Sequence, residues 1–93
     1  MVRKIVVLAG RVQGVGFRDT VVGHARRFDV AGSVRNLREP EALEIDVEGD
    51  AEEVERFIAA VLSGPPTWAR VEEITTRAGA PLGRTGFDRS HSR

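Results

Sequence analysis

The chain has 93 residues, its 14 Lys and Arg residues balance its 14 Asp and Glu residues, and it contains no cysteine. A formal net charge of zero argues against a nucleic-acid or anionic-membrane partner, and the lack of cysteine excludes disulfides and thiolate metal sites. The longest apolar run, residues 5–9, is far shorter than the roughly 20 residues that a membrane-spanning helix needs. The sequence therefore predicts one small cytoplasmic domain, residues 1–93, with a single core.

The first half of the chain predicts a strand, a helix and a hairpin of two strands. Residues 3–12 have the apolar, β-branched character of a strand that is central to a sheet. Residues 17–28 repeat apolar side chains with the period of a helix, and residues 32–37 resume an extended pattern. Residues 42–48 alternate apolar and acidic side chains, as a half-buried strand requires.

The second half predicts another helix, another strand and a polar tail. The helix begins at Asp50, which can form a capping box with Glu53, and it ends at the Gly and Pro residues of 63–66. Residues 69–76 predict a fourth strand and residues 77–86 a loop. The tail after that loop is polar apart from its first residue, so we expect a last edge strand there to be short or frayed.

This order of elements indicates the fold class. Strand, helix, strand, strand, helix, strand is the split βαβ arrangement. It predicts a ferredoxin-like α/β sandwich, in which an antiparallel sheet of four to five strands carries both helices on one face.

The link between the first strand and the first helix has the composition of an anion-binding loop. Gly14 and Gly16 can take positive φ and turn successive backbone N–H groups toward one point, and the following helix adds the positive end of its dipole. Arg18 can offer a planar fork of donors to the same anion. The predicted phosphate-binding residues are Gln13, Gly14, Val15, Gly16, Phe17 and Arg18.

The segment Gly-Arg-Val-Gln-Gly-Val-Gly-Phe-Arg, residues 10–18, and the later Gly-Ser-Val-Arg-Asn, residues 32–36, resemble the acylphosphatase family. Small members of that family carry G-x-V-Q-G-V-G-F-R followed by G-x-V-x-N, and the resemblance runs roughly from Arg3 to Phe87. It implies a hydrolase, without cofactor or metal, that cleaves the carboxyl-phosphate bond of small acyl phosphates to a carboxylate and inorganic phosphate. It also implies that Arg18 binds the phosphate and that Asn36 orients the attacking water.

The reaction suits these residues, although the chain departs from the family pattern in two places. A carboxylate leaving group has a conjugate acid of pKa near 4, so it needs no general acid, and positioning and charge stabilisation remain. The connection 38–41 lacks the Asp-Gly turn that is typical of the family and is about one residue longer. The residues after Phe87 lack the family's usual apolar side chains.

Other functions remain open at this point. The same fold can be a non-catalytic phosphate-binding or protein-docking module, an RNA-binding module, or the first part of a larger carbamoyl-transferring maturation protein. Net neutrality and the absence of interleaved aromatic residues on a strand weigh against RNA. The short chain favours the free-standing enzyme, and we expect a monomer that acts on a small molecule.

Several conspicuous side chains carry an ordinary structural interpretation. The acidic residues of the 42–48 strand fit a solvated face better than a metal site. His24 and His91 have no suitably spaced catalytic partner, and the cluster of residues 90–92 does not predict a triad. Trp68 is expected to cover the end of the second helix.

Overall fold

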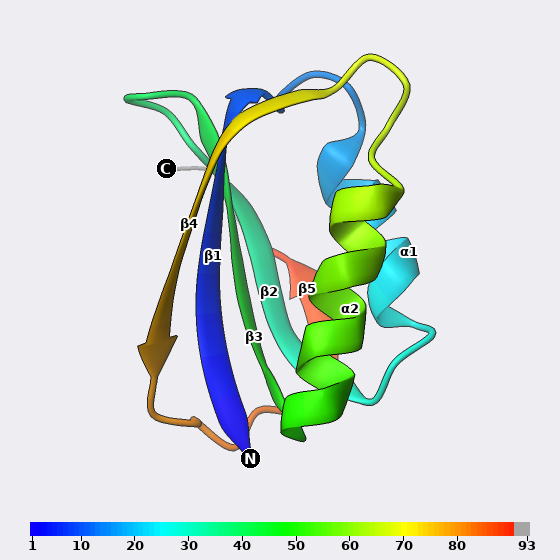
Figure 1. Ribbon diagram of the computed structural model, residues 1–93, viewed down its shortest axis with the longest axis vertical. Helices are drawn as coiled ribbons and strands as arrows, with labels where there is room; N and C mark the ends of the chain where they lie inside the picture. The colour runs from blue at the N-terminus through cyan, green and yellow to red at the C-terminus, as the bar shows by residue number, and fades with distance from the viewer. Residues whose placement is uncertain (91–93) are drawn as a thin grey trace.

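Five strands and two helices follow one another in the computed structural model, which describes residues 1–90 (Figure 1). In chain order they are β1 (Val2–Arg11), α1 (Phe17–Ala25), β2 (Val30–Leu37), β3 (Ala42–Gly49), α2 (Ala51–Ser63), β4 (Arg70–Gly79) and β5 (Phe87–Arg89). This succession confirms the predicted order, and β5 is as short as the polar tail suggested. The expectations for His91 and Ser92 fall outside the described residues.

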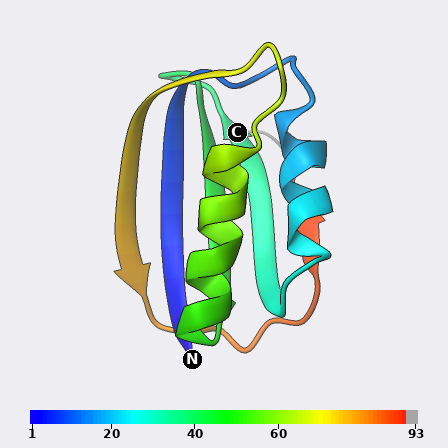
Figure 2. The same ribbon diagram turned by 45° about the vertical axis from the view of Figure 1, so that its right-hand side comes forward.

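The strands form one sheet in the order β4-β1-β3-β2-β5. The pairs β1–β3, β1–β4 and β2–β3 are antiparallel, whereas β5 runs parallel to β2. The expected antiparallel sheet is therefore confirmed for four strands, and the fifth makes the sheet mixed. Both helices cover the same face (Figures 1 and 2), so the ferredoxin-like prediction is confirmed.

The core lies between the helices and the sheet. Register places Val6 opposite Ile45 and Leu8 opposite Leu43, so the apolar residues of β1 and β3 meet on the helix-covered face. The helices contribute buried residues at helical spacing, and Phe57 packs edge-to-face with Phe87 at 5.3 Å between ring centroids. The buried cluster consists of Val6, Leu8, Val12, Phe17, Val21, Ala25, Val34, Leu43, Ile45, Val47, Val54, Phe57 and Val61.

Three element boundaries differ from the sequence prediction by two residues or more. Helix α1 ends at Ala25 rather than at residue 28, although Phe28 still packs against the core. Strand β4 continues to Gly79 because β1 is long enough to pair with it as far as Arg3. β2 begins at residue 30, since the ladder with β3 extends to that end of the sheet.

The predicted capping box of α2 is wrong. Asp50 occupies the N-cap position, but its side chain makes no capping hydrogen bond. The Glu53 carboxylate accepts a hydrogen bond of 2.8 Å from the backbone N–H of Asp29 instead. A contact between α2 and the segment before β2 thus replaces the local reciprocal cap.

The expectation that the acidic residues of β3 form a solvated face is also wrong. On the face opposite the helices, Asp46 receives two hydrogen bonds from the Arg3 guanidinium, at 2.9 and 2.8 Å, and one from Arg84 at 2.7 Å. Glu44 pairs with Arg35 at 2.8 Å. Arginine side chains and a loop cover this face, so it is a network of ion pairs.

Glu48 is the most deeply buried member of that network, with 1% of the residue exposed. Its Oε1 accepts from the N–H groups of Leu82, Gly83 and Arg84 at 3.0, 2.7 and 3.3 Å, and its Oε2 accepts from Arg84 Nε at 2.6 Å. Burial alone would raise the pKa of Glu48, but these hydrogen bonds outweigh it and lower the pKa. The hydrogen bond from Arg3, opposed by burial and reinforced by Arg84, lowers the pKa of Asp46 to about 2.

Two further expectations have different outcomes. The His24 ring lies 3.1 Å from the Gly64 carbonyl oxygen, which confirms a structural role between the helices. Trp68 is 76% exposed, so the expectation that it covers the end of α2 is wrong. Among residues 1–90, no helix combines the length and the apolar character needed to cross a membrane.

Candidate active site

The loop between β1 and α1 has the backbone conformation that its glycines predicted. Gly14 has φ +72° and Gly16 has φ +78°, both in the left-handed region. A Cβ atom at either position would meet no atom within 4 Å, so backbone conformation rather than crowding calls for glycine. Gly16 is the N-cap of α1 and offers no side chain to cap the helix.

The N–H groups of residues 14–18 donate no hydrogen bond to any acceptor in residues 1–90. The first N–H groups of any helix lack an intrahelical acceptor, and the helix dipole adds partial positive charge there. The left-handed glycines Gly14 and Gly16 precede the helix and extend this row of donors into the loop. The result is a concentration of unused donors at one end of the sheet.

The start of the loop is fixed by the β2–β3 connection. Glu41 Oε2 accepts hydrogen bonds from the backbone N–H groups of Val12 and Gln13, at 3.3 and 3.1 Å. The side-chain amide of Gln13 donates to the carbonyl oxygens of Leu37 and Ala42. Gln13 therefore anchors the loop to the β2–β3 hairpin, and the unused backbone donors begin at the next residue.

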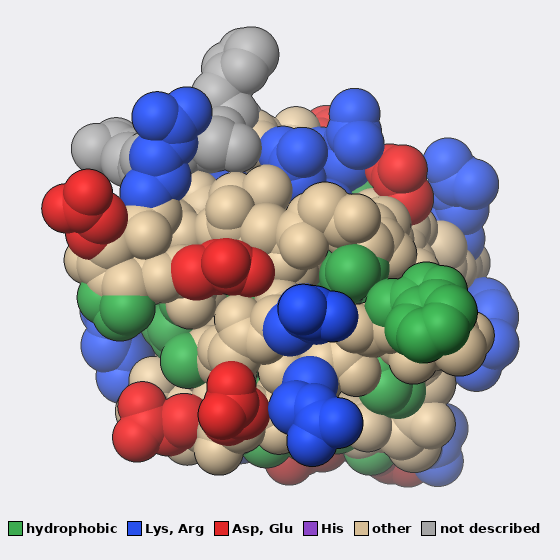
Figure 3. Space-filling view, turned by 90° about the horizontal axis from the view of Figure 1, so that it is seen from above, with side chains coloured by type: hydrophobic (Ala, Val, Ile, Leu, Met, Phe, Trp, Pro, Cys, Tyr) green, Lys and Arg blue, Asp and Glu red, His purple; other side chains and the backbone are tan. Residues whose placement is uncertain are grey.

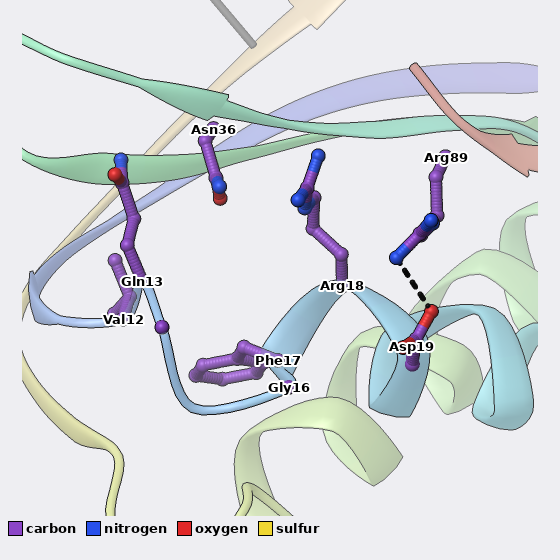
Figure 4. Close-up of a pocket in the computed structure, with 9 residues that line it drawn as sticks. Val12, Gln13, Gly16, Phe17, Arg18, Asp19, Asn36 and Arg89 are labelled. Atoms are coloured by element: carbon purple, nitrogen blue, oxygen red, sulfur yellow. Dashed lines mark ion pairs between the residues drawn. The ribbon is translucent and has the colours of Figure 1, made fainter. Parts of the chain in front are cut away.

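A pocket of about 110 Å³ lies where this loop faces β2. It is several times larger than the roughly 10–15 Å³ that one water molecule needs. Figure 4 shows Arg18 reaching from the start of α1 toward the sheet, while Asn36 reaches from β2 into the same hollow. The lining residues are Val12, Gln13, Gly14, Gly16, Phe17, Arg18, Asp19, Asn36 and Arg89.

The pocket brings together most, but not all, of the predicted residues. Arg18 and Asn36 both line it, as do four of the five other predicted loop residues, namely Gln13, Gly14, Gly16 and Phe17. Val15 is not among the lining residues and packs against the hydrophobic core, while the Phe17 side chain is buried there. These two residues can contribute backbone N–H groups only.

Asn36 carries an unsatisfied acceptor. Its Oδ1 is buried and has no hydrogen-bond partner within the described part of the chain. Such an acceptor is costly when it is left alone, so native proteins usually pair it with a donor or a water molecule. An unused acceptor thus faces the same pocket as the unused donors of the loop.

Three lining residues, Val12, Asp19 and Arg89, were not predicted. Arg89, the last residue of β5, forms an ion pair with Asp19, with its Nη1 2.9 Å from Asp19 Oδ1 (Figure 4). Residue spacing carries little signal for this contact, because Arg89 lies in a polar tail where the family usually has apolar side chains. Only the parallel pairing of β5 with β2 brings it beside α1.

The end of the molecule that carries the pocket is not uniformly basic. Figure 3 shows the end of the molecule that carries the loop, where Lys and Arg side chains are interspersed with acidic and hydrophobic ones. Within residues 1–90, no group of three or more His, Asp and Glu side chains can hold a metal ion. The positive charge at this pocket comes from the loop N–H groups and from Arg18 and Arg89.

These features define a small α/β protein with a pocket of unused backbone donors at its first strand–helix junction. A sequence model of the acylphosphatase family matches residues 4–89. The acylphosphatase of Acidiphilium cryptum is 47% identical over 87 residues, covering 94% of this chain and 93% of that protein. The chain belongs to the acylphosphatase family, and it is an enzyme that hydrolyses acyl phosphates.

Solved structures agree with this assignment. The acylphosphatase from Bacillus subtilis matches with a TM-score of 0.88 and 31% identity, covering 97% of this chain and 99% of that one. HypF from T. kodakarensis matches with a TM-score of 0.86 and 32% identity, covering 100% of this chain and 12% of HypF. A unit of this fold therefore also occurs inside a much longer chain.

Proposed function

We propose that the N–H groups of residues 14–18 and the Arg18 guanidinium hold the phosphoryl group of a small acyl phosphate, while Asn36 orients the attacking water. One observation carries this proposal: unused donors in the loop and the buried, unpaired Asn36 Oδ1 line the same pocket. Gln13 supports the loop through the β2–β3 hairpin.

The phosphoryl oxygens carry the charge that the transition state must distribute. Backbone N–H groups fixed by left-handed glycines need little reorganisation to meet that charge, and the helix dipole points the same way. Arg18 adds a guanidinium that can donate two parallel hydrogen bonds to the same group. Together they favour the transition state by preorganised electrostatics.

The water is the second requirement. Asn36 Oδ1 can accept a hydrogen bond from a water molecule, and Asn36 Nδ2 can donate to a phosphoryl oxygen. The water oxygen forms the new bond to phosphorus, and the bond from phosphorus to the acyl oxygen breaks. A phosphoryl oxygen takes up the water's proton, and the carboxylate leaves without one.

This mechanism uses no metal ion. The carboxylates of β3, which are the obvious ligands for a hard cation, lie on the opposite face of the sheet and are held by Arg3, Arg35 and Arg84. We expect hydrolysis of benzoyl phosphate to be unchanged in excess EDTA. Loss of activity that added Mg²⁺ restores would contradict this part of the proposal.

We further propose a monomeric cytoplasmic enzyme that does not bind nucleic acid. Ferredoxin-like sheets that bind RNA present aromatic side chains on the open face. Here that face carries ion pairs around Asp46, and the phenylalanines lie in or against the core on the other side. Gel filtration and an RNA electrophoretic shift assay test these statements.

The decisive experiment measures inorganic phosphate release from benzoyl phosphate and from phenyl phosphate. Wild type is expected to hydrolyse the first and not the second, because phenolate is a much poorer leaving group than benzoate. Asn36→Ala should lower turnover of benzoyl phosphate about 10²- to 10³-fold. Asn36→Asp, nearly the same size but negative, should lower turnover at least as much, because its charge repels the phosphoryl group.

The control variant is Arg77→Ala, which removes an exposed arginine of β4 outside the pocket lining and should retain wild-type turnover. Equal hydrolysis of both substrates would contradict the leaving-group argument. Saturable binding of inorganic phosphate without turnover of benzoyl phosphate would favour the non-catalytic binding module instead.

A further inference from the structure

The mechanism proposed above leaves the second guanidinium of the pocket without a role. Arg89 lies on β5, where it pairs with Val34 of β2. Asn36 lies on the same strand as Val34. The Arg89 side chain is 51% exposed, and it reaches the first turn of α1 to contact Asp19. Arg89 and Asp19 both line the pocket beside Arg18.

The in-line geometry of the reaction predicts which part of the substrate lies near Arg89 and Asp19. In-line displacement places the attacking water and the leaving oxygen on opposite sides of phosphorus. Figure 4 shows Arg18 between Asn36 on one side and Arg89 on the other. A water held by Asn36 therefore leaves the acyl group extending toward Arg89 and Asp19.

The ion pair itself shows which ligand Arg89 accommodates. Asp19 Oδ1 is a carboxylate oxygen 2.9 Å from Arg89 Nη1, and both side chains are more than half exposed. Exposed pairs of this kind are weak, so a ligand carboxylate can compete with Asp19 for the guanidinium. The planar fork of arginine has several donors and suits a carboxylate particularly well.

We infer that Arg89 and Asp19 form a subsite for the acyl group that favours acyl phosphates of dicarboxylic acids. Arg89 attracts the second carboxylate, and Asp19 moderates that attraction because its negative charge opposes the ligand's. The inference rests on the proposed function, since the in-line argument assumes a phosphoryl group at Arg18 and a water at Asn36.

The test compares kcat/KM for matched substrates: benzoyl phosphate, its 3- and 4-carboxy derivatives, and neutral 4-carbamoylbenzoyl phosphate. The readout is the preference ratio, which is kcat/KM for the better carboxy derivative divided by that for the carbamoyl derivative. Arg89→Ala should lower this ratio about three- to tenfold, and Arg89→Lys should retain part of it. Asp19→Asn should raise the ratio, because it leaves the guanidinium without its internal partner.

The double variant Asp19→Asn with Arg89→Ala separates this role from a structural one. The subsite predicts a ratio as low as that of Arg89→Ala, since the anion-binding group is gone. If the pair only ties β5 to α1, all variants lose thermal stability but keep the wild-type ratio, and the inference is overturned. Because each ratio is taken on one enzyme preparation, loss of folded protein does not move it.

Failure of this inference is distinguishable from failure of the proposed function. Hydrolysis of all four substrates with ratios that Arg89 and Asp19 do not influence would overturn the subsite alone. Absence of hydrolysis with every substrate in the wild-type enzyme would overturn the proposed function, and the subsite with it.

Discussion

Two loops of this molecule gather backbone N–H groups around left-handed glycines, and they lie at opposite ends of the sheet (Figure 1). In the loop 82–84, Gly83 has φ +75° and three successive N–H groups donate to the buried carboxylate of Glu48. In the loop 14–18, Gly14 and Gly16 have nearly the same φ, but no acceptor within residues 1–90 receives their N–H groups.

The comparison shows that similar backbone geometry can either be paired with a carboxylate of the chain itself or leave its donors unused. Glu48 and Arg84 satisfy the loop 82–84 internally, so that loop ties the end of the sheet together. In the loop 14–18 no acceptor of residues 1–90 takes up the donors, and we propose that they bind an external phosphoryl group beside Arg18. The first arrangement should govern stability and the second should govern catalysis.

The largest expected effect is on catalysis, from Arg18→Ala. Removing a preorganised donor to the developing charge should lower kcat/KM for benzoyl phosphate about 10²- to 10³-fold, or about 2.7–4 kcal/mol. The melting temperature should stay close to that of wild type, because Arg18 makes no ion pair within residues 1–90. Near-wild-type turnover would refute the role of Arg18 and the proposed catalytic role of the loop 14–18.

Next in size is the effect of Glu48→Ala on stability. The change leaves three backbone N–H groups and one side of the Arg84 guanidinium without a partner, so the free energy of unfolding should fall by about 2–4 kcal/mol. Urea unfolding followed by circular dichroism measures this loss. Glu48→Gln, which keeps one acceptor, should lose less, and kcat of the folded fraction should change little in either variant.

Acid should weaken the ion-pair network, and the stability of the protein should therefore fall at low pH. The pKa values of Asp46 and Glu48 are lower in the folded state than in the unfolded chain, so the unfolded chain takes up protons first. Their stabilisation is complete above about pH 5 and is lost as the pH falls through 4 toward 2. Unfolding midpoints of Asp46→Asn should fall less steeply over this range, and an identical slope would contradict the assignment.

The smallest effects come from alanine substitutions at two glycines of similar accessibility. Gly16→Ala forces a left-handed alanine, which should cost about 1–2 kcal/mol and weaken phosphate binding. Gly23→Ala lies inside α1, where an added Cβ meets no atom within 4 Å, and should stabilise by about 0.5–1 kcal/mol. Thermal melts should show a lower melting temperature for Gly16→Ala and a higher one for Gly23→Ala. Shifts in the same direction would show that the φ argument fails.

Local patterns were sufficient to predict most of the fold and the centre of the site. The apolar alternation of β3 and the helical stripe of α2 report burial directly, because each periodicity corresponds to one face. Gly14, Gly16 and Arg18 are close in sequence, so their placement at one pocket could be predicted without knowledge of the fold. Asn36 came from the resemblance to the family, and its placement in the pocket required β2 to lie beside the loop.

What the sequence did not predict are contacts between distant segments. The acidic residues of β3 have the same pattern as any solvated strand, and only the return of the loop 82–84 reveals that Glu48 is buried. Glu41 and Arg89 are similar cases, since one fixes the start of the loop 14–18 and the other joins its pocket. Such pairings depend on topology, which residue spacing alone does not encode.

The most direct test titrates ¹⁵N-labelled protein with inorganic phosphate and follows both loops by NMR. The amide resonances of residues 14–18 should shift saturably with one dissociation constant, and those of residues 82–84 should stay in place because Glu48 already occupies their donors. Absence of saturable shifts at residues 14–18, or equal shifts in both loops, would contradict the distinction between an open and a filled anion site.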